Sequence, residues 1–152
     1  MNEGNNKKRM SQNESVASSA EALTPPPPGF TSPFNSVEQW LAYICDNDQP
    51  QKSIEEYRFD LYEAPGDNML SLTGYNHTVE EGMPVSRIDF VPAKHPFFAL
   101  PKDVYKNLSQ EQTKNIVFKE LNEFIASQKF NDSFLSKAFY INTSFAGEIW
   151  SK

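Results

Sequence analysis

Apolar and polar side chains alternate in three consecutive short segments, and this pattern restricts the fold more than any other feature of the sequence. The segments are Tyr57–Tyr62, Met69–Tyr75 and Val85–Val91. Alternation with a period of two is typical of β-strands that bury one face. A turn is expected over residues 64–68 and a longer polar loop over Asn76–Pro84. Consecutive strands on short connections predict an antiparallel meander.

Two further segments repeat apolar residues at helical spacing. The first, residues 37–45, follows a capping box that begins at Ser36, and the second, residues 110–127, follows one that begins at Ser109. A capping box satisfies the unpaired backbone N–H groups of the first helical turn with side-chain oxygens. We therefore expect two amphipathic helices, and a shorter helix over residues 132–137.

The C-terminal residues 139–150 are predicted to form a β-hairpin that turns at Gly147. Before the long helix, Pro92, Pro96 and Pro101 are expected to keep the chain extended. Strands grouped first and helices after them favour an α+β fold over alternating α/β units. We expect one twisted antiparallel β-sheet, made of the meander and the C-terminal hairpin, with helices packed on one face.

The first 28 residues differ in composition from the rest of the chain. They are rich in Asn, Ser, Glu and Ala, and they end in four consecutive prolines. Such a segment has too few large apolar residues to offset the entropy of ordering. We expect a disordered polar, proline-rich tail over residues 1–28 and a single α+β domain over residues 29–152.

The cysteine content and the lack of apolar runs predict a cytoplasmic protein. The chain has one cysteine, Cys45, which cannot form an internal disulfide and fits a reducing compartment. No apolar stretch follows the basic residues near the N-terminus, so a secretory signal is not expected. No apolar run approaches the ~20 residues that a membrane helix needs.

The charge of the chain indicates what kind of partner it attracts. Its 20 acidic and 14 basic residues give a formal net charge of −6. Charges within residues 1–28 cancel, so the whole excess lies on the domain. An acidic domain repels nucleic acids and anionic membranes and attracts basic proteins. We expect a basic protein partner, although mild acidity also serves solubility alone; the oligomeric state stays open.

No sequence motif of enzyme chemistry occurs in the chain. It has no glycine-rich phosphate loop, no CxxC, no HExxH and no GxSxG. We therefore expect no cofactor, no bound metal and no catalytic residue, and we expect that the protein is not an enzyme.

An uncharacterised enzyme remains the alternative, because a few residues of suitable type are present. Histidine titrates near neutral pH, and paired carboxylates can perform acid–base work. The candidates are His77, His95, Asp60 and Asp89. Cross-strand ion pairs with Arg58 and Arg87 explain the two aspartates without any site. Cys45 ends the apolar stripe of the first helix and is expected to be buried and structural.

The acidic residues matter more as a group, because they gather in loops and at strand ends. They are Asp46, Asp48, Glu55, Glu56, Glu63, Asp67, Glu80 and Glu81. In the longest predicted loop, a pair of glutamates follows a tyrosine and a histidine. Aromatic side chains supply contact area and carboxylates supply steering; a merely solvated loop is the alternative. The predicted partner-binding residues are Asp67, Tyr75, His77, Glu80 and Glu81.

Four short segments carry a family resemblance. They are residues 59–68 (FDLYEAPGDN), 72–76 (LTGYN), 100–103 (LPKD) and 147–150 (GEIW). With these segments the chain resembles, over about residues 34–152, small bacterial immunity proteins encoded beside polymorphic toxins. The resemblance implies an α+β protein that binds a cognate toxin and blocks it in the cytoplasm. It assigns no binding residue, because the segments are structural turns and strand ends.

The leading hypothesis is therefore a protein-binding module, an immunity protein that neutralises a toxin. The alternatives are the uncharacterised enzyme and an adaptor that docks through its proline-rich tail.

Overall fold

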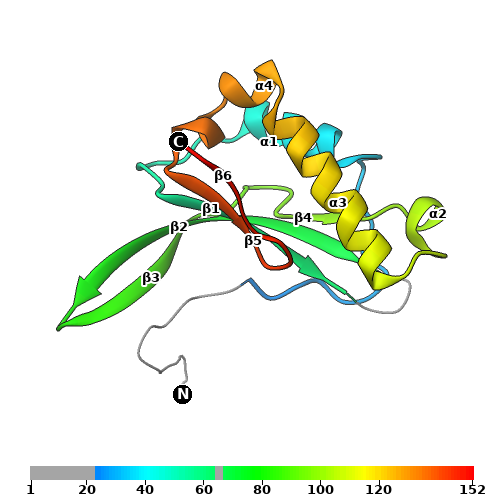
Figure 1. The fold of residues 1–152 in the computed structure, drawn as a ribbon, viewed down its shortest axis with the longest axis horizontal. Helices are drawn as coiled ribbons and strands as arrows, with labels where there is room; N and C mark the ends of the chain where they lie inside the picture. The colour runs from blue at the N-terminus through cyan, green and yellow to red at the C-terminus, as the bar shows by residue number, and fades with distance from the viewer. Residues whose placement is uncertain (1–22, 64–66) are drawn as a thin grey trace.

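The computed structural model describes residues 23–63 and 67–152, so the predictions for residues 1–22 and 64–66 lie outside the described residues. The elements in chain order are α1 (Val37–Asn47), β1 (Glu56–Tyr62), β2 (Met69–Glu80), β3 (Met83–Phe90), β4 (Phe97–Ala99), α2 (Lys102–Tyr105), α3 (Gln110–Ile125), α4 (Gln128–Asn131), the 3-10 helix η1 (Phe134–Lys137), β5 (Tyr140–Thr143) and β6 (Gly147–Ser151). All strands belong to one sheet, and α1, α3 and α4 lie on one of its faces (Figure 1). The predicted α+β architecture is confirmed.

The sheet has the strand order β3-β2-β1-β5-β6, with β4 paired to the beginning of β2. Every pair is antiparallel except β1 with β5, which is parallel. The helical connection returns the chain to the beginning of β1, where the backbone N–H of Phe139 donates to the Glu55 carbonyl at 2.9 Å. Because of this, β5 enters the sheet in the direction of β1. This one parallel pair is the difference from the antiparallel sheet that the sequence predicts.

The loop predicted over Asn76–Pro84 is wrong, because β2 and β3 continue through it as a long hairpin. β2 runs to Glu80, and β3 begins at Met83. Between them, Glu81 and Gly82 have φ values of 53° and 79°, as in the two-residue turns that fit the twist of a hairpin. The hairpin extends beyond the rest of the molecule (Figure 1). Solvent on both faces of its end removes the alternation on which strand prediction depends.

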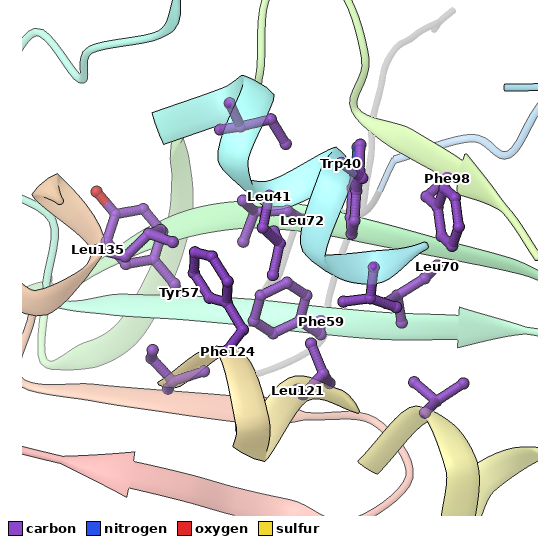
Figure 2. Packing of buried hydrophobic residues seen from close by; sticks show 14 of the residues in the cluster. Trp40, Leu41, Tyr57, Phe59, Leu70, Leu72, Phe98, Leu121, Phe124 and Leu135 are labelled. Atoms are coloured by element: carbon purple, nitrogen blue, oxygen red, sulfur yellow. The ribbon is translucent and has the colours of Figure 1, made fainter. Parts of the chain in front are cut away.

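The core lies between the helices and the inner face of the sheet, which is the face toward α1 and α3. Trp40 of α1 is fully buried and stacks on Phe98 with ring centroids 5.6 Å apart. Phe59 of β1 meets the same indole edge-on. Figure 2 shows these rings together with Leu72 of β2 and Leu121 of α3. Burying a large apolar side chain contributes about 1.5–3 kcal/mol, so this contact of helix and sheet holds the two layers together.

Both predicted helix starts are confirmed by their caps. Ser36 Oγ accepts a hydrogen bond from the Gln39 backbone N–H, and Ser109 Oγ accepts one from Gln112, both at 3.1 Å. At Ser109 the reciprocal bond of a full capping box is also present. The short helix predicted over residues 132–137 is the 3-10 helix η1, which is capped by Ser133. The preceding turn α4, capped by Ser127, was not predicted.

Residues 23–33 lie against the domain, although the sequence places most of them in a tail. The Gly29 backbone N–H donates to the buried carboxylate of Asp67 at 2.9 Å. The Ala99 backbone N–H of β4 donates to Ser32 Oγ at 2.8 Å. In Figure 1 this segment passes on the side of the sheet away from the helices. It thereby covers the edge of β4, where an unpaired backbone N–H would otherwise be exposed.

Replacing Gly74 with alanine should destabilise the fold. A Cβ at this position would lie 2.9 Å from the Phe90 Cβ and 3.0 Å from the Ile54 Cγ2, inside the core where neighbours have little room to move. Overpacking of this kind costs about 1–3 kcal/mol, so the urea midpoint of Gly74→Ala should fall. Thr78→Ala, at an exposed position of the same strand, should change it far less. An unchanged midpoint for Gly74→Ala would contradict this close approach.

Candidate binding site on the outer face of the sheet

The outer face of the sheet, away from the helices, is lined by polar and aromatic side chains. They alternate along β1 and β2 with the core residues of the inner face, as a pleated strand requires. In cross-strand pairs they are Glu56 with Tyr75, Arg58 with Thr73, Asp60 with Ser71 and Tyr62 with Met69, and Tyr140 of β5 pairs with Glu56 from the other side.

Glu56 is the centre of a network on this face, and we call its members the Glu56 network. Its side chain is only 1% exposed. One carboxylate oxygen accepts a hydrogen bond from Arg58 Nε at 3.0 Å and forms an ion pair with Arg58 Nη2 at the same distance. The other lies 2.7 Å from His77 Nε2 and accepts from the Tyr140 hydroxyl at 3.4 Å. Since a buried charge is tolerated only when it is paired and hydrogen-bonded, the network fixes three side chains in place.

The imidazole of His77 bridges the network to β3. Its Nδ1 lies 2.7 Å from Ser86 Oγ, so a hydroxyl, an imidazole and a carboxylate follow one another as in a hydrolase triad. Ser86 lies within a strand, however, where successive backbone N–H groups point in opposite directions. An oxyanion hole needs N–H groups that converge beside the nucleophile. The arrangement can therefore orient a proton on His77, but it lacks the geometry for stabilising an oxyanion.

Arg58 and Tyr75 form a second contact on the outer face. The guanidinium carbon lies 4.5 Å from the centroid of the tyrosine ring, within cation–π range. Burial raises the pKa of Tyr75, and the Arg58 charge offsets this only in part. Burial and Glu56 likewise raise the pKa of Tyr140. Both phenols are therefore neutral at physiological pH and present aromatic surface and hydroxyl groups.

The end of the β2–β3 hairpin, Val79–Met83, combines apolar and acidic side chains, and we call it the hairpin tip. Val79 is 72% exposed and Met83 is 44% exposed. Glu80 forms an ion pair with Arg87 at 2.6 Å, while Glu81 occupies the turn. Exposed apolar side chains on a projecting element, flanked by carboxylates, are a feature of surfaces that bind proteins.

The structure brings four of the five predicted binding residues onto β2 and its turn. Tyr75 and His77 are neighbours on the outer face, with parallel rings 6.4 Å apart. Glu80 and Glu81 belong to the hairpin tip. Asp67 lies beyond the opposite end of β2, about 40 Å from Glu80 along an extended strand. Its carboxylate accepts a hydrogen bond from the Gly29 backbone N–H. It therefore does not contribute to the same surface.

Sequence reasoning missed the centre of the network, Glu56, together with Tyr140. The expectation that Arg58 and Arg87 pair with aspartates is wrong, because their partners are Glu56 and Glu80. The contact between Glu56 and Tyr140 joins residues far apart in the sequence, because it depends on the parallel pairing of β1 with β5. Composition and periodicity within one segment carry no information about such a contact.

The residues of the enzyme alternative do not converge. His95 packs edge-on against Tyr43 with ring centroids 5.2 Å apart, whereas His77 belongs to the Glu56 network. Within the described residues, no hydrogen bond or ion pair joins either histidine to Asp60 or Asp89. The expected acid–base grouping is therefore not formed.

Neither a metal site, nor a membrane-spanning helix, nor a similar protein indicates what this surface does. In the described part of the chain, no group of three His, Cys, Asp or Glu residues is placed to hold a metal ion. Over residues 23–63 and 67–152, no helix has the length and apolar character needed to cross a bilayer. Comparison with protein-family models, curated proteins and solved structures finds no match.

Replacing Glu56 with glutamine should lower the free energy of unfolding by about 2–3 kcal/mol, because the Arg58 charge loses its buried partner. Urea denaturation measures the change. Glu80→Gln, which breaks the exposed pair with Arg87, should cost less than about 1 kcal/mol. Similar losses for the two variants would contradict the central place of Glu56.

The Cys45 thiol should react slowly with a disulfide reagent at neutral pH. Burial raises its pKa above the ordinary value of 9.0, and Ser133 and Lys129 offset this only in part. Because the thiolate is the reactive form, the labelling rate should keep rising above pH 9 in the folded protein. Labelling at pH 7 as fast as that of an unfolded control in urea would contradict this.

Proposed function

We propose that this chain is a protein-binding module, and more narrowly an immunity protein that binds and neutralises a cognate bacterial toxin in the cytoplasm. The observation that carries the proposal is the hairpin tip, where exposed Val79 and Met83 adjoin the carboxylates of Glu80 and Glu81. Apolar side chains gain most in an interface when a partner removes them from water. The sequence resemblance to immunity proteins supports the toxin as partner.

The outer face extends the contact surface beyond the hairpin tip. β2 carries both, so Tyr75 and His77 continue along the strand from the tip. Protein interfaces are enriched in tyrosine and arginine, which supply large contact areas at low entropic cost. The Glu56 network holds Arg58 and His77 in place before binding, which reduces the ordering cost of association.

The net charge supports a basic partner. The chain has a formal charge of −6, and the carboxylates of the hairpin tip project into solvent. Opposite charge on the partner would raise the association rate by long-range steering. A basic toxin domain is one class of protein with such a surface, and the charge argument applies to any basic partner.

A hydrolase is the second candidate, because Ser86, His77 and Glu56 follow one another at 2.7 Å, although the strand around Ser86 does not supply the convergent N–H groups of an oxyanion hole. Hydrolysis of p-nitrophenyl acetate by the full chain tests it. Turnover that disappears in Ser86→Ala would favour this candidate over a binding module.

Changing the hairpin tip should weaken partner binding without unfolding the protein. The full chain serves as bait in the source organism, and the captured basic protein is then purified for kinetic measurement. In Val79→Ser/Met83→Ser the affinity should fall at least about tenfold, because two apolar contacts are lost. Glu80→Gln/Glu81→Gln should chiefly lower the association rate, and raising salt to about 0.5 M should reduce the difference from wild type.

Val104→Ser is the matched control, since Val104 is 58% exposed on α2, and its affinity should remain at the wild-type level. An association rate that does not respond to salt would remove the electrostatic part of the proposal. If the tip variant binds with unchanged affinity, the hairpin tip is not part of the binding surface. Loss of binding on deletion of residues 1–28, with the tip variant unaffected, would favour the adaptor that docks through its tail.

A further inference from the structure

Two buried hydroxyl groups on the outer face lack a hydrogen-bond partner. Ser71 and Thr73 are each 1% exposed, and no described residue offers a hydrogen bond to Ser71 Oγ or Thr73 Oγ1. Leaving a buried polar group unpaired costs about 1–3 kcal/mol. Since folded proteins pair nearly all such groups, two on consecutive outward positions of one strand indicate a place where a ligand supplies the missing bonds.

A carboxylate without an ion pair lies beside them. Asp60 is directly opposite Ser71 in the β1–β2 ladder. Arg58, two residues earlier, is bonded to Glu56 instead, and within the described residues Asp60 forms no hydrogen bond or salt bridge. Burial raises the pKa of Asp60, and the charge of Arg58 offsets this only in part. The group therefore lacks the cation that its position would suit.

Aromatic rings lie at both ends of this group. Tyr62 follows Asp60 on β1, and Tyr75 follows Thr73 on β2. Burial raises the pKa values of both tyrosines; Ser71 offsets this in part at Tyr62, and Arg58 and then Thr73 do so at Tyr75. Neither hydroxyl, however, reaches the geometry of a hydrogen bond. The tyrosines thus provide neutral aromatic faces beside a set of oxygen atoms.

We infer that Asp60, Ser71 and Thr73 bind an arginine side chain of the protein partner, and we call these three residues the arginine site. This inference deepens the proposed function and rests on it, since it names the partner's side chain. A carboxylate and two hydroxyl oxygens all accept hydrogen bonds, and a guanidinium group is a cation with donors only. Its planar face also stacks on tyrosine rings.

The spacing of the two hydroxyls favours arginine over lysine. Residues two apart on one strand have Cα atoms about 6.7 Å apart, and a single ammonium nitrogen forms hydrogen bonds of about 2.9 Å. An ammonium group would have to serve both hydroxyls from one nitrogen. A guanidinium group presents its N–H donors from separate nitrogens in a rigid fork, so it can span Ser71 and Thr73 while its charge faces Asp60.

One weak contact ties Tyr62, at the edge of the arginine site, to the N-terminal segment. The Tyr62 hydroxyl donates to the Leu23 carbonyl at 3.4 Å, a length at the limit of a hydrogen bond. Tyr62→Phe removes the contact and keeps the ring, so it should raise the affinity of the site or leave it unchanged.

The test uses N-acetyl-arginine amide as the probe and the full chain labelled with ¹⁵N. At constant ionic strength, the probe should shift the backbone amides of residues 58–62 and 71–75 in a saturable way, with a Kd in the millimolar range that suits one side chain. Asp60→Asn should weaken binding about tenfold, as expected for loss of a charge-assisted pair. The neutral citrulline analogue should not bind, and the lysine analogue should bind more weakly.

Ser71→Ala separates a binding role from a structural one. Removing an unpaired buried hydroxyl should leave the urea midpoint unchanged or raise it, yet arginine affinity should fall severalfold. Asp103→Asn, an exposed change on α2, is the control for net charge and should not alter binding. The inference is overturned if the shifts are absent, if Asp103→Asn and Asp60→Asn behave alike, or if the lysine analogue binds as well. Because the titration needs no partner, its failure is distinct from a failure of the hairpin variants.

Discussion

The first part of strand β2, Met69–Tyr75, is buried on both faces of the sheet, although helices cover only one of them. On the inner face Leu70 and Leu72 are buried in the core, and on the outer face Ser71 and Thr73 are buried nearly as fully. Polar atoms in that position cannot rely on bulk water, so their hydrogen bonds must come from adjacent strands or from a bound molecule. The same constraint places Glu56 in a network in which its carboxylate oxygens are paired.

The Glu56 network joins parts of the chain that are far apart in sequence. Glu56 lies on β1, His77 on β2 and Tyr140 on β5, and the Glu56–Tyr140 bond spans 84 positions. Tyr140 reaches this place because the helices carry the chain back to the beginning of β1 before β5 enters the sheet (Figure 1). The helical layer thus positions the outer face without contributing a side chain to it. A change in the core that moves the helices would therefore also displace Tyr140 in the Glu56 network on the outer face.

Features that depend on local sequence could be predicted, and those that depend on long-range pairing could not. The caps at Ser36 and Ser109 and the alternation along β1 act within a few residues, so the elements and the α+β class follow from them. The hairpin over residues 76–84 was hidden because solvent surrounds its end. Glu56 was counted only as an acidic residue, since its partners come from other strands. Asp67 shows the converse: composition cannot reveal that a carboxylate accepts a bond from the chain's own backbone.

The two acidic parts of the surface are suited to different steps of binding. Carboxylates at the hairpin tip are exposed, so each contributes little to affinity in water but acts over several ångströms and is weakened by salt. Asp60 lies among buried hydroxyls, where an interaction is strong only if donor geometry and charge both match. A basic partner would therefore be attracted at the tip and selected at the arginine site. Because Ser71 and Thr73 are held unpaired by the fold, the cost of that arrangement is incurred before binding, and a matching donor gains the full benefit when it arrives.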